Sequence, residues 1–196
     1  MDSALIELFF VNKNISSIDH HDQLVFTKGW YAIFTVWCFF LFQFYSGFEY
    51  EFYLVNRETR QAPFPGIQIF STLRNNFDEH IVNQILLDMP KIGVDIITSN
   101  SEYGPGQMEI NFGPASGITA ADHGFRFKNG VKEIAQKNGY MASFMTKPYA
   151  DQSANGCHYH HSLVDLKTGK NAFSNVDTPT ELNDLCRWWT GGQIKH

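Results

Sequence analysis

Apolar and polar residues alternate along the stretch FEYEFYLV, which begins at Phe48. On an extended strand, Phe48, Tyr50 and Phe52 fall on one face. Glu49 and Glu51 fall on the opposite face. Two carboxylates on the same face repel each other unless they face water or a positive group lies between them. The pattern therefore predicts a strand with an apolar and an acidic face, and the acidic face is either solvated or binds a cation.

Two later segments show the spacing of amphipathic helices, in which apolar residues recur every three or four positions. The first covers residues 76–89, and Pro90 and Gly93 are expected to end it. The second covers residues 119–138, and Gly139 supplies the left-handed conformation that often follows a helix. The apolar positions are Phe77, Ile81, Ile85 and Met89 in the first helix and Phe127, Val131, Ile134 and Ala135 in the second.

Further strands and one more helix complete the pattern. Residues 94–98 and 140–145 read as strands, and the loop SEYGPGQ leads into another strand by about Met108. The stretch TPTE is a helix start signal, with Thr178 as N-cap, a proline at the first helical position and Glu181 as the capping-box acid. We therefore expect a last helix near the C-terminus.

Composition narrows the class of protein. With 196 residues, 43% of them hydrophobic and 18% charged, the chain can bury a core of ordinary size in one domain. A net charge of −5 and the absence of a Lys/Arg run argue against a nucleic-acid partner. The three cysteines form no C-x-x-C pair, which excludes a disulfide framework and a thiolate zinc site and suits a reducing, cytoplasmic compartment.

Residues 29–48 contain no charged side chain. This apolar run is long enough to cross a bilayer as a helix. The alternative is that part of this run is a buried aromatic strand or does not belong to the folded domain. Phe48 adjoins Glu49 without a spacer, so a bilayer span ending there would leave the strand little room to pair. We therefore interpret the run as part of an altered N-terminus rather than a membrane anchor.

The stretch GCHYHHSL places three histidines within four positions. On a strand, the two faces would carry His158, His160 and Ser162 on one side and Cys157, Tyr159 and His161 on the other. Two imidazoles on one face suit a divalent metal or a phosphate, and they also occur as ordinary surface or core residues.

Two more glutamates flank the Gly-Pro-Gly loop that precedes the strand at Met108. Glu102 lies before the turn and Glu109 lies on the strand after it. Hard oxygen ligands of this kind suit Mg²⁺ or Mn²⁺, and four glutamates with one histidine are enough to hold two such ions.

The catalytic domain of glutamine synthetase has motifs that resemble four stretches of this chain, in the same order: GFEYEFYL, SEYGPGQMEINF, AADHGFRFKNGVKEIAQKNGYMASFMTKPYA and GCHYHHSL. The resemblance covers residues 47–196 as a partial catalytic domain and leaves residues 1–46 unmatched. It implies an α+β fold, in which a curved antiparallel sheet has flanking helices on its outer side and its carboxylate face turned inward.

The resemblance also implies a reaction, in which ATP phosphorylates the γ-carboxylate of glutamate and ammonia displaces the phosphate. By position, it assigns one Mg²⁺ or Mn²⁺ ion to Glu51, Glu102 and Glu109, a second to Glu49 and His158, and ATP contacts to His160 and Ser162. His161 and Cys157 point away and are interpreted as packing residues. Family members form rings, so a homo-oligomer or assembly with full-length relatives is expected.

The chain also departs from the family. The small first domain and the arginine segment that binds glutamate and phosphate have no counterpart within residues 1–196, so no catalytic residue is assigned and the chain alone is expected to form little glutamine. Ser153 and Ala154 stand where Asn and Gly are usual. Two alternatives follow: a non-enzymatic, lengsin-like structural protein of the same family, and a cupin-like metal enzyme, which the helix-rich middle disfavours.

Overall fold

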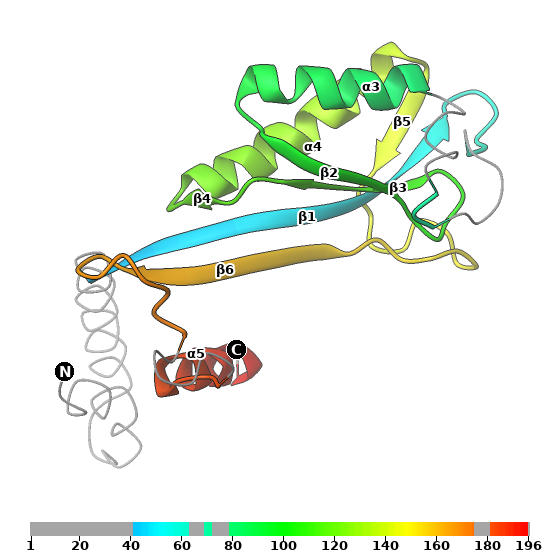
Figure 1. Cartoon of the computed structure of the whole chain (residues 1–196). Helices are drawn as coiled ribbons and strands as arrows, with labels where there is room; N and C mark the ends of the chain where they lie inside the picture. The colour runs from blue at the N-terminus through cyan, green and yellow to red at the C-terminus, as the bar shows by residue number, and fades with distance from the viewer. Residues whose placement is uncertain (1–40, 63–68, 72–78, 175–180, 196) are drawn as a thin grey trace, which may run out of the picture. The chain divides into compact units, whose positions relative to one another are not determined.

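A computed structural model describes residues 41–62, 69–71, 79–174 and 181–195. Within them the chain forms an open six-stranded sheet with helices, which confirms the α+β class (Figure 1). The strands are β1 (Phe42–Asn56), β2 (Ile96–Ser101), β3 (Gln107–Phe112), β4 (Ala115–Ser116), β5 (Tyr140–Ser143) and β6 (Cys157–Asp165). The helices are α3 (Glu79–Asp88), α4 (Thr119–Lys137), α5 (Asp184–Lys195) and the short 3₁₀ helix η3 (Pro90–Ile92).

Strand β1 is the centre of the sheet, and every pairing is antiparallel. Strands β3 and β4 pair along one edge of β1, and β6 and β5 pair along its other edge. The register sets Glu51 opposite Glu109 and Glu49 opposite His158. Since each strand alternates its faces, these pairs project to the same side of the sheet.

The hydrophobic core lies between the sheet and helices α3 and α4, which Figure 1 shows on one side of it. Tyr50 and Phe52 reach this core from β1, as the alternation predicts. Phe127 of α4 is fully buried, and its ring contacts those of Tyr50, Phe52, Phe112 and Phe144. Aromatic packing of this kind fixes how β1 and β3 lie against α4.

Element ends differ from the sequence pattern at several points. Strand β1 begins at Phe42, earlier than the alternation indicates. Helix α5 begins at Asp184, because the Asn183 side chain accepts a hydrogen bond from the amide of Cys186 at 3.0 Å and so acts as the cap. Glu181 therefore lies before the helix, contrary to the capping-box prediction, and Thr178 lies outside the described residues.

Two of the predicted helix ends are confirmed. Gly93 and Gly139 both adopt left-handed backbone conformations, with φ of +83° and +78°. Gly139 follows α4, whereas Gly93 caps the short helix η3 that comes after the end of α3 at Asp88. The helix predicted over residues 76–89 is seen from Glu79, and Phe77 lies outside the described residues.

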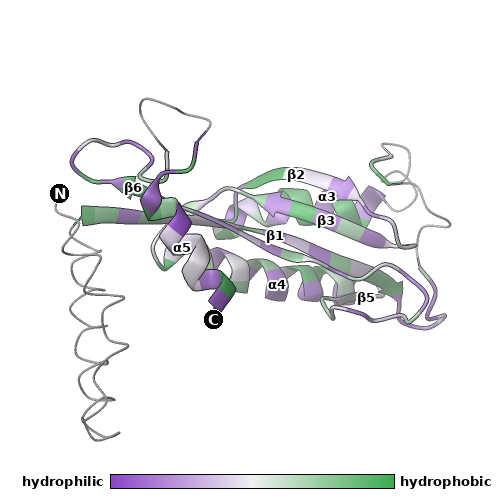
Figure 2. Cartoon of the chain, turned by 90° about the horizontal axis from the view of Figure 1, so that it is seen from below, coloured by the Kyte–Doolittle hydropathy of each residue, from purple (hydrophilic) through white to green (hydrophobic). Residues whose placement is uncertain are grey.

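The apolar run divides between two parts of the chain. Residues 29–40 lie outside the described residues, and residues 42–48 belong to β1. Among the helices that the structure describes, none has the length and apolar character needed to cross a bilayer. Hydropathy changes from residue to residue along the strands, as Figure 2 shows.

Candidate metal- and nucleotide-binding face

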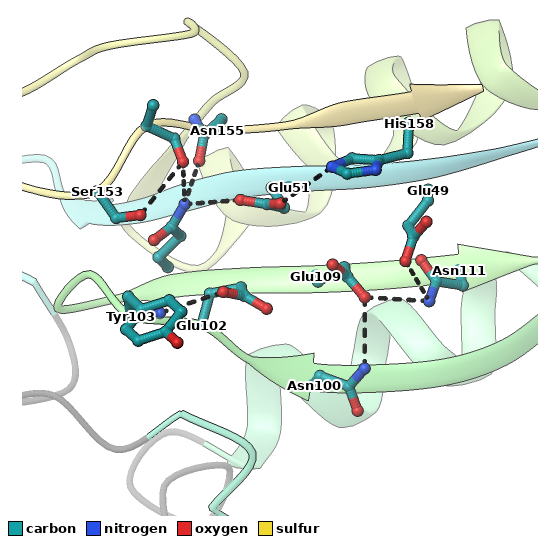
Figure 3. Close-up of polar contacts among 12 residues, drawn as sticks. Glu49, Glu51, Asn100, Glu102, Tyr103, Glu109, Asn111, Ser153, Asn155 and His158 are labelled. Carbon is teal, nitrogen blue, oxygen red and sulfur yellow. Dashed lines mark hydrogen bonds and ion pairs between the residues drawn. The ribbon is translucent and has the colours of Figure 1, made fainter.

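One face of the sheet carries acidic and imidazole side chains from three strands. Glu49 and Glu51 come from β1, Glu109 from β3, and His158 and His160 from β6. In Figure 3 the side chains of Glu49, Glu51, Glu109 and His158 lie over the same stretch of β1 and β3. The alternation that buries Tyr50 and Phe52 under the helices places Glu49 and Glu51 on this opposite face.

Glu49 is held by a histidine. Its Oε2 lies 2.6 Å from Nε2 of His160. This hydrogen bond, together with the charges of His160 and His158, lowers the pKa of Glu49 in spite of its partial burial. His158 lies opposite Glu49 in register, yet its Nε2 is 4.0 Å from Oε1 of Glu51. In this structure the direct contact of Glu49 is therefore with His160 and not with His158.

Glu109 is held by two amide side chains. Asn111 donates to its Oε1 at 3.1 Å and Asn100 donates to the same oxygen at 3.4 Å. Burial raises the pKa of Glu109 and the negative charge of Glu49 raises it further, while the two amides oppose this. The Asn111 amide also lies 3.5 Å from Oε1 of Glu49, so it bridges two carboxylates that repel each other.

Glu102 and Ser162 occupy the margins of this face. Glu102 is only 7% exposed, follows β2, and accepts a hydrogen bond from the amide of Tyr103 at 3.3 Å (Figure 3). Ser162 lies opposite Tyr45 in register. It is about 13 Å along β6 from His158, because four residues of a strand rise about 3.3 Å each. The structure therefore brings Glu49, Glu51, Glu109, His158 and His160 together and leaves Ser162 farther out.

The donor set fits a hard divalent cation, although within the described residues no three of these side chains already surround a point where an ion would bind. The ion pairs described for Glu49 and Glu51 are with histidines, so no lysine or arginine in the described residues neutralises them. A Cβ on Gly156 would lie 2.7 Å from Oε1 of Glu51 and from Nε2 of His158, so the glycine keeps the space between them open. Carboxylate oxygens are the ligands that Mg²⁺ and Mn²⁺ prefer.

Three amide residues of the face were missed by the sequence reasoning. They are Gln107, Asn111 and Asn100. Gln107 is fully buried and donates to Oε2 of Glu51 at 3.0 Å. The sequence contains a pattern that predicts the placement of two of them. In the stretch QMEIN, every second residue is polar, so one face of β3 carries Gln107, Glu109 and Asn111.

His161 is a packing residue, as predicted. Its ring stacks on Phe44 with centroids 5.8 Å apart, and its Nε2 accepts a hydrogen bond from Nε1 of Trp189 at 2.6 Å. This contact joins helix α5 to the pair formed by β1 and β6. His161 is therefore directed away from the acidic face.

Comparison with known proteins identifies the family. Residues 40–196 match the family model described as glutamine synthetase, catalytic domain. Since the match covers most of the chain, the chain belongs to the glutamine synthetase catalytic-domain family.

Its relatives include both enzymes and lengsin. The chain is 35% identical over 161 residues to glutamate–isopropylamine ligase of Pseudomonas sp, covering 76% of this chain and 35% of the relative. It is 31% identical over 156 residues to glutamine synthetase of Thermotoga maritima, and this match covers 78% of this chain and 35% of the relative. It is 34% identical over 161 residues to lengsin of Canis lupus familiaris, covering 79% and 26%. The chain thus spans about a third or less of these relatives' lengths.

Solved structures agree with the fold. A structure described as apo GmaS without ligand superposes with a TM-score of 0.72 at 27% identity, covering 81% of this chain and 38% of that one. A structure described as a novel glutamine synthase homolog gives a TM-score of 0.71 at 24% identity, covering 80% and 35%. The family and the α+β catalytic-domain fold implied by the sequence motifs are therefore confirmed.

Replacing Glu109 by Gln is expected to stabilise the metal-free chain at pH 7 by about 0.2–1 kcal/mol, the range for side chains directly opposite each other on paired strands. Gln keeps the acceptor oxygen for Asn111 and Asn100 and removes a negative charge that is repelled by Glu49 and lies opposite Glu51 in register. Because the folded pKa of Glu109 is raised, its ionisation destabilises the folded chain above that pKa. Urea denaturation should show the gain at pH 7 and its disappearance at about pH 3, where the carboxyl is protonated in both states. An equal gain at both pH values would show that charge is not its cause.

Replacing Gly156 by Ala is expected to weaken Mn²⁺ binding about tenfold, the lower end of the range for disturbed neighbours of metal ligands. The new Cβ would enter the space between Glu51 and His158. Gly192→Ala is the matched control, because its Cβ would meet no atom within 4 Å. Isothermal titration calorimetry with MnCl₂ measures the Mn²⁺ affinity of each variant. Equal affinities for the two variants would contradict the prediction.

Proposed function

We propose that this chain is the metal- and nucleotide-binding part of an ATP-dependent carbon–nitrogen ligase that joins an amine to the γ-carboxylate of glutamate through an acyl phosphate. The observation that carries the proposal is the face on which Glu49, Glu51 and Glu109 meet two histidines from β6. Membership of the glutamine synthetase family supports it.

In the proposed site, Glu51, Glu102 and Glu109 hold one Mg²⁺ or Mn²⁺ ion, and Glu49 with His158 holds most of a second. When bound, the ions neutralise the charge that develops on phosphate oxygens during phosphoryl transfer. The protein's part is to hold these carboxylates close together. Asn111 and Gln107 serve this purpose, since each donates an amide N–H to a carboxylate without cancelling its charge.

His160 and Ser162 are proposed to contact ATP. The side chain of His160 is exposed at the edge of the acidic face, so its imidazole can reach a bound phosphate. Its Nε2 lies 2.6 Å from Oε2 of Glu49, so the histidine proposed to contact ATP is in direct contact with a carboxylate proposed to hold an ion.

The amine and the assembly are further parts of the proposal. Ammonia is the acceptor implied by the glutamine synthetase motifs, and a relative named glutamate–isopropylamine ligase makes a larger amine an equal candidate. Assembly as a homo-oligomer or with full-length relatives, and a cytoplasmic location, remain predictions.

The second candidate is a structural, lengsin-like role. The identity to lengsin supports it, and so does the presence of Ser153 and Ala154 at positions where the family usually has Asn and Gly. A structural relative does not need to keep its metal and nucleotide affinity. The two candidates therefore differ in a property that can be measured without turnover.

Calorimetric titration of residues 1–196 with MnCl₂, followed by ATP, tests the proposal. We expect about two Mn²⁺ ions per chain and tighter ATP binding after Mn²⁺ is bound, because bound cations would neutralise negative charge on the phosphates of ATP. The variant Glu58→Gln should bind Mn²⁺ and ATP as the unmodified chain does, since this exposed glutamate lies in the turn after β1. Absence of Mn²⁺ binding by the folded chain would favour the structural role.

A further inference from the structure

A pair of buried polar side chains holds the segment that leads into β6. Tyr53 of β1 and Gln107 of β3 lie opposite each other in register, and both are fully buried. The hydroxyl of Tyr53 donates to the carbonyl oxygen of Ser153 at 2.7 Å. The amide of Gln107 donates to the next carbonyl, that of Ala154, at 2.9 Å. One cross-strand pair therefore binds two consecutive peptide groups of a distant loop.

The Gln107 amide also contacts the acidic face and the loop side chain. Its Nε2 lies 3.0 Å from Oε2 of Glu51 and 3.0 Å from Oδ1 of Asn155. Its Oε1 accepts from the amide of Gly104 at 2.9 Å. Since every polar atom of this buried side chain is engaged, a movement of either Glu51 or the loop would leave buried polar groups unpaired.

Asn155 anchors the same loop to β5. Its backbone amide donates to the carbonyl oxygen of Thr146 at 2.7 Å. Its side-chain amide donates to the carbonyl oxygens of Met145 at 2.8 Å and Ser143 at 3.2 Å. The loop is thus closed on itself by Asn155 and joined to the sheet by Gln107 and Tyr53.

Gly104 makes room for this arrangement. A Cβ at this position would lie 2.0 Å from the hydroxyl oxygen of Tyr53. The tight turn before β3 therefore depends on a glycine in order to admit the Tyr53 ring, whose hydroxyl reaches the loop. Loop, turn and strand are packed as one unit.

We propose that Gln107 is a positioning residue that fixes the carboxylate of Glu51 relative to residues 153–156, and through them relative to His158 at the start of β6. The same amide holds the carboxylate and the loop, so they keep one mutual arrangement. The inference rests on the proposed function only for its effect on metal affinity. The link between Glu51 and the loop is independent of that function.

Gln107→Glu tests the proposal, because it preserves shape and the acceptor for Gly104 while replacing the donor amide by a carboxylate beside Glu51. Hydrogen–deuterium exchange measured by mass spectrometry should show exchange at residues 153–156 faster by about tenfold, in excess of any change across the sheet. Mn²⁺ affinity, measured by electron paramagnetic resonance, should fall about tenfold. Met108→Leu is the control, since the neighbouring Met108 is equally buried but faces the hydrophobic core.

Tyr53→Phe separates the two contacts. It removes the hydrogen bond to Ser153 and leaves Gln107 with Glu51. We expect faster exchange at residues 153–154 and a Mn²⁺ affinity within about twofold of the unmodified chain, because a lost neutral hydrogen bond acts locally. If Gln107→Glu fails to fold, Asn155→Ser tests the link from the loop side and should likewise speed exchange.

The outcomes separate the two proposals. Exchange at residues 153–156 that changes no more in Gln107→Glu than in Met108→Leu would overturn the positioning role. A metal affinity unchanged by Gln107→Glu would overturn its effect on Glu51. Absence of Mn²⁺ binding by the unmodified chain would instead overturn the proposed function, and the exchange comparison would still decide whether Gln107 holds the loop.

Discussion

Replacing Glu51 by Gln is expected to weaken Mn²⁺ binding by about 100-fold or more, beyond what the loss of a ligand's neighbour usually causes. Glu51 lies opposite Glu109, next to His158, and accepts a hydrogen bond from Gln107. Gln keeps the shape and an acceptor for Gln107, so the change removes mainly the negative charge that binds the cation. Electron paramagnetic resonance of free Mn²⁺ measures the affinity directly.

The control for this variant is Glu58→Gln, which removes the same charge from an exposed position after β1. It should leave the affinity within about twofold, because exposed charges are screened by solvent and salt. An equal loss of Mn²⁺ affinity in the two variants would mean that the affinity depends only on the net charge of the chain. An unaltered affinity in Glu51→Gln would remove Glu51 from the metal site.

Replacing Phe127 by Ala is expected to lower the free energy of unfolding by about 3–5 kcal/mol, the usual range for a buried phenylalanine. Its ring is fully buried between the sheet and α4 and contacts four other aromatic rings. The residual cavity cannot collapse easily, because Tyr50 and Phe52 are fixed on β1 and Phe112 is fixed on β3, while Phe144 directly follows β5. Urea denaturation followed by circular dichroism gives the change.

Phe125→Ala on the same helix is the matched control, since Phe125 is 72% exposed. It should change the free energy of unfolding by no more than about 0.5 kcal/mol. A similar loss in both variants would mean that burial of the Phe127 ring is not the cause of the loss, because alanine itself favours the helix. A loss below about 1 kcal/mol in Phe127→Ala would show that this side chain does not pack as described.

Much of the fold was readable from short-range patterns. The alternation from Phe48 to Phe52 predicts which face of β1 is buried, because successive side chains of a strand point to opposite sides. Gly93 and Gly139 mark helix ends because a left-handed backbone favours glycine. The motif order also indicated the family, which the catalytic-domain match confirms.

The features of the fold and the site that could not be predicted depend on contacts between residues far apart in the sequence. Periodicity places Glu49 and His160 on matching faces, but it does not say that they meet at 2.6 Å, which depends on the register of β1 and β6. The engagement of Gln107 with Glu51 and with Ala154 joins residues 56 and 47 positions apart. The predicted start of α5 was wrong: the stretch TPTE has the residues of a capping box, but in the structure the side chain of Asn183 caps the helix.

Anomalous X-ray diffraction from crystals grown with MnCl₂ tests the central claim most directly. The account predicts Mn²⁺ peaks on the acidic face, within about 2.0–2.6 Å of carboxylate oxygens. Glu51 and Glu109 should share one ion, and Glu49 should bind the other together with His158. The account would be contradicted by crystals that show no anomalous peak on this face, or that show Mn²⁺ ions bound only by other residues.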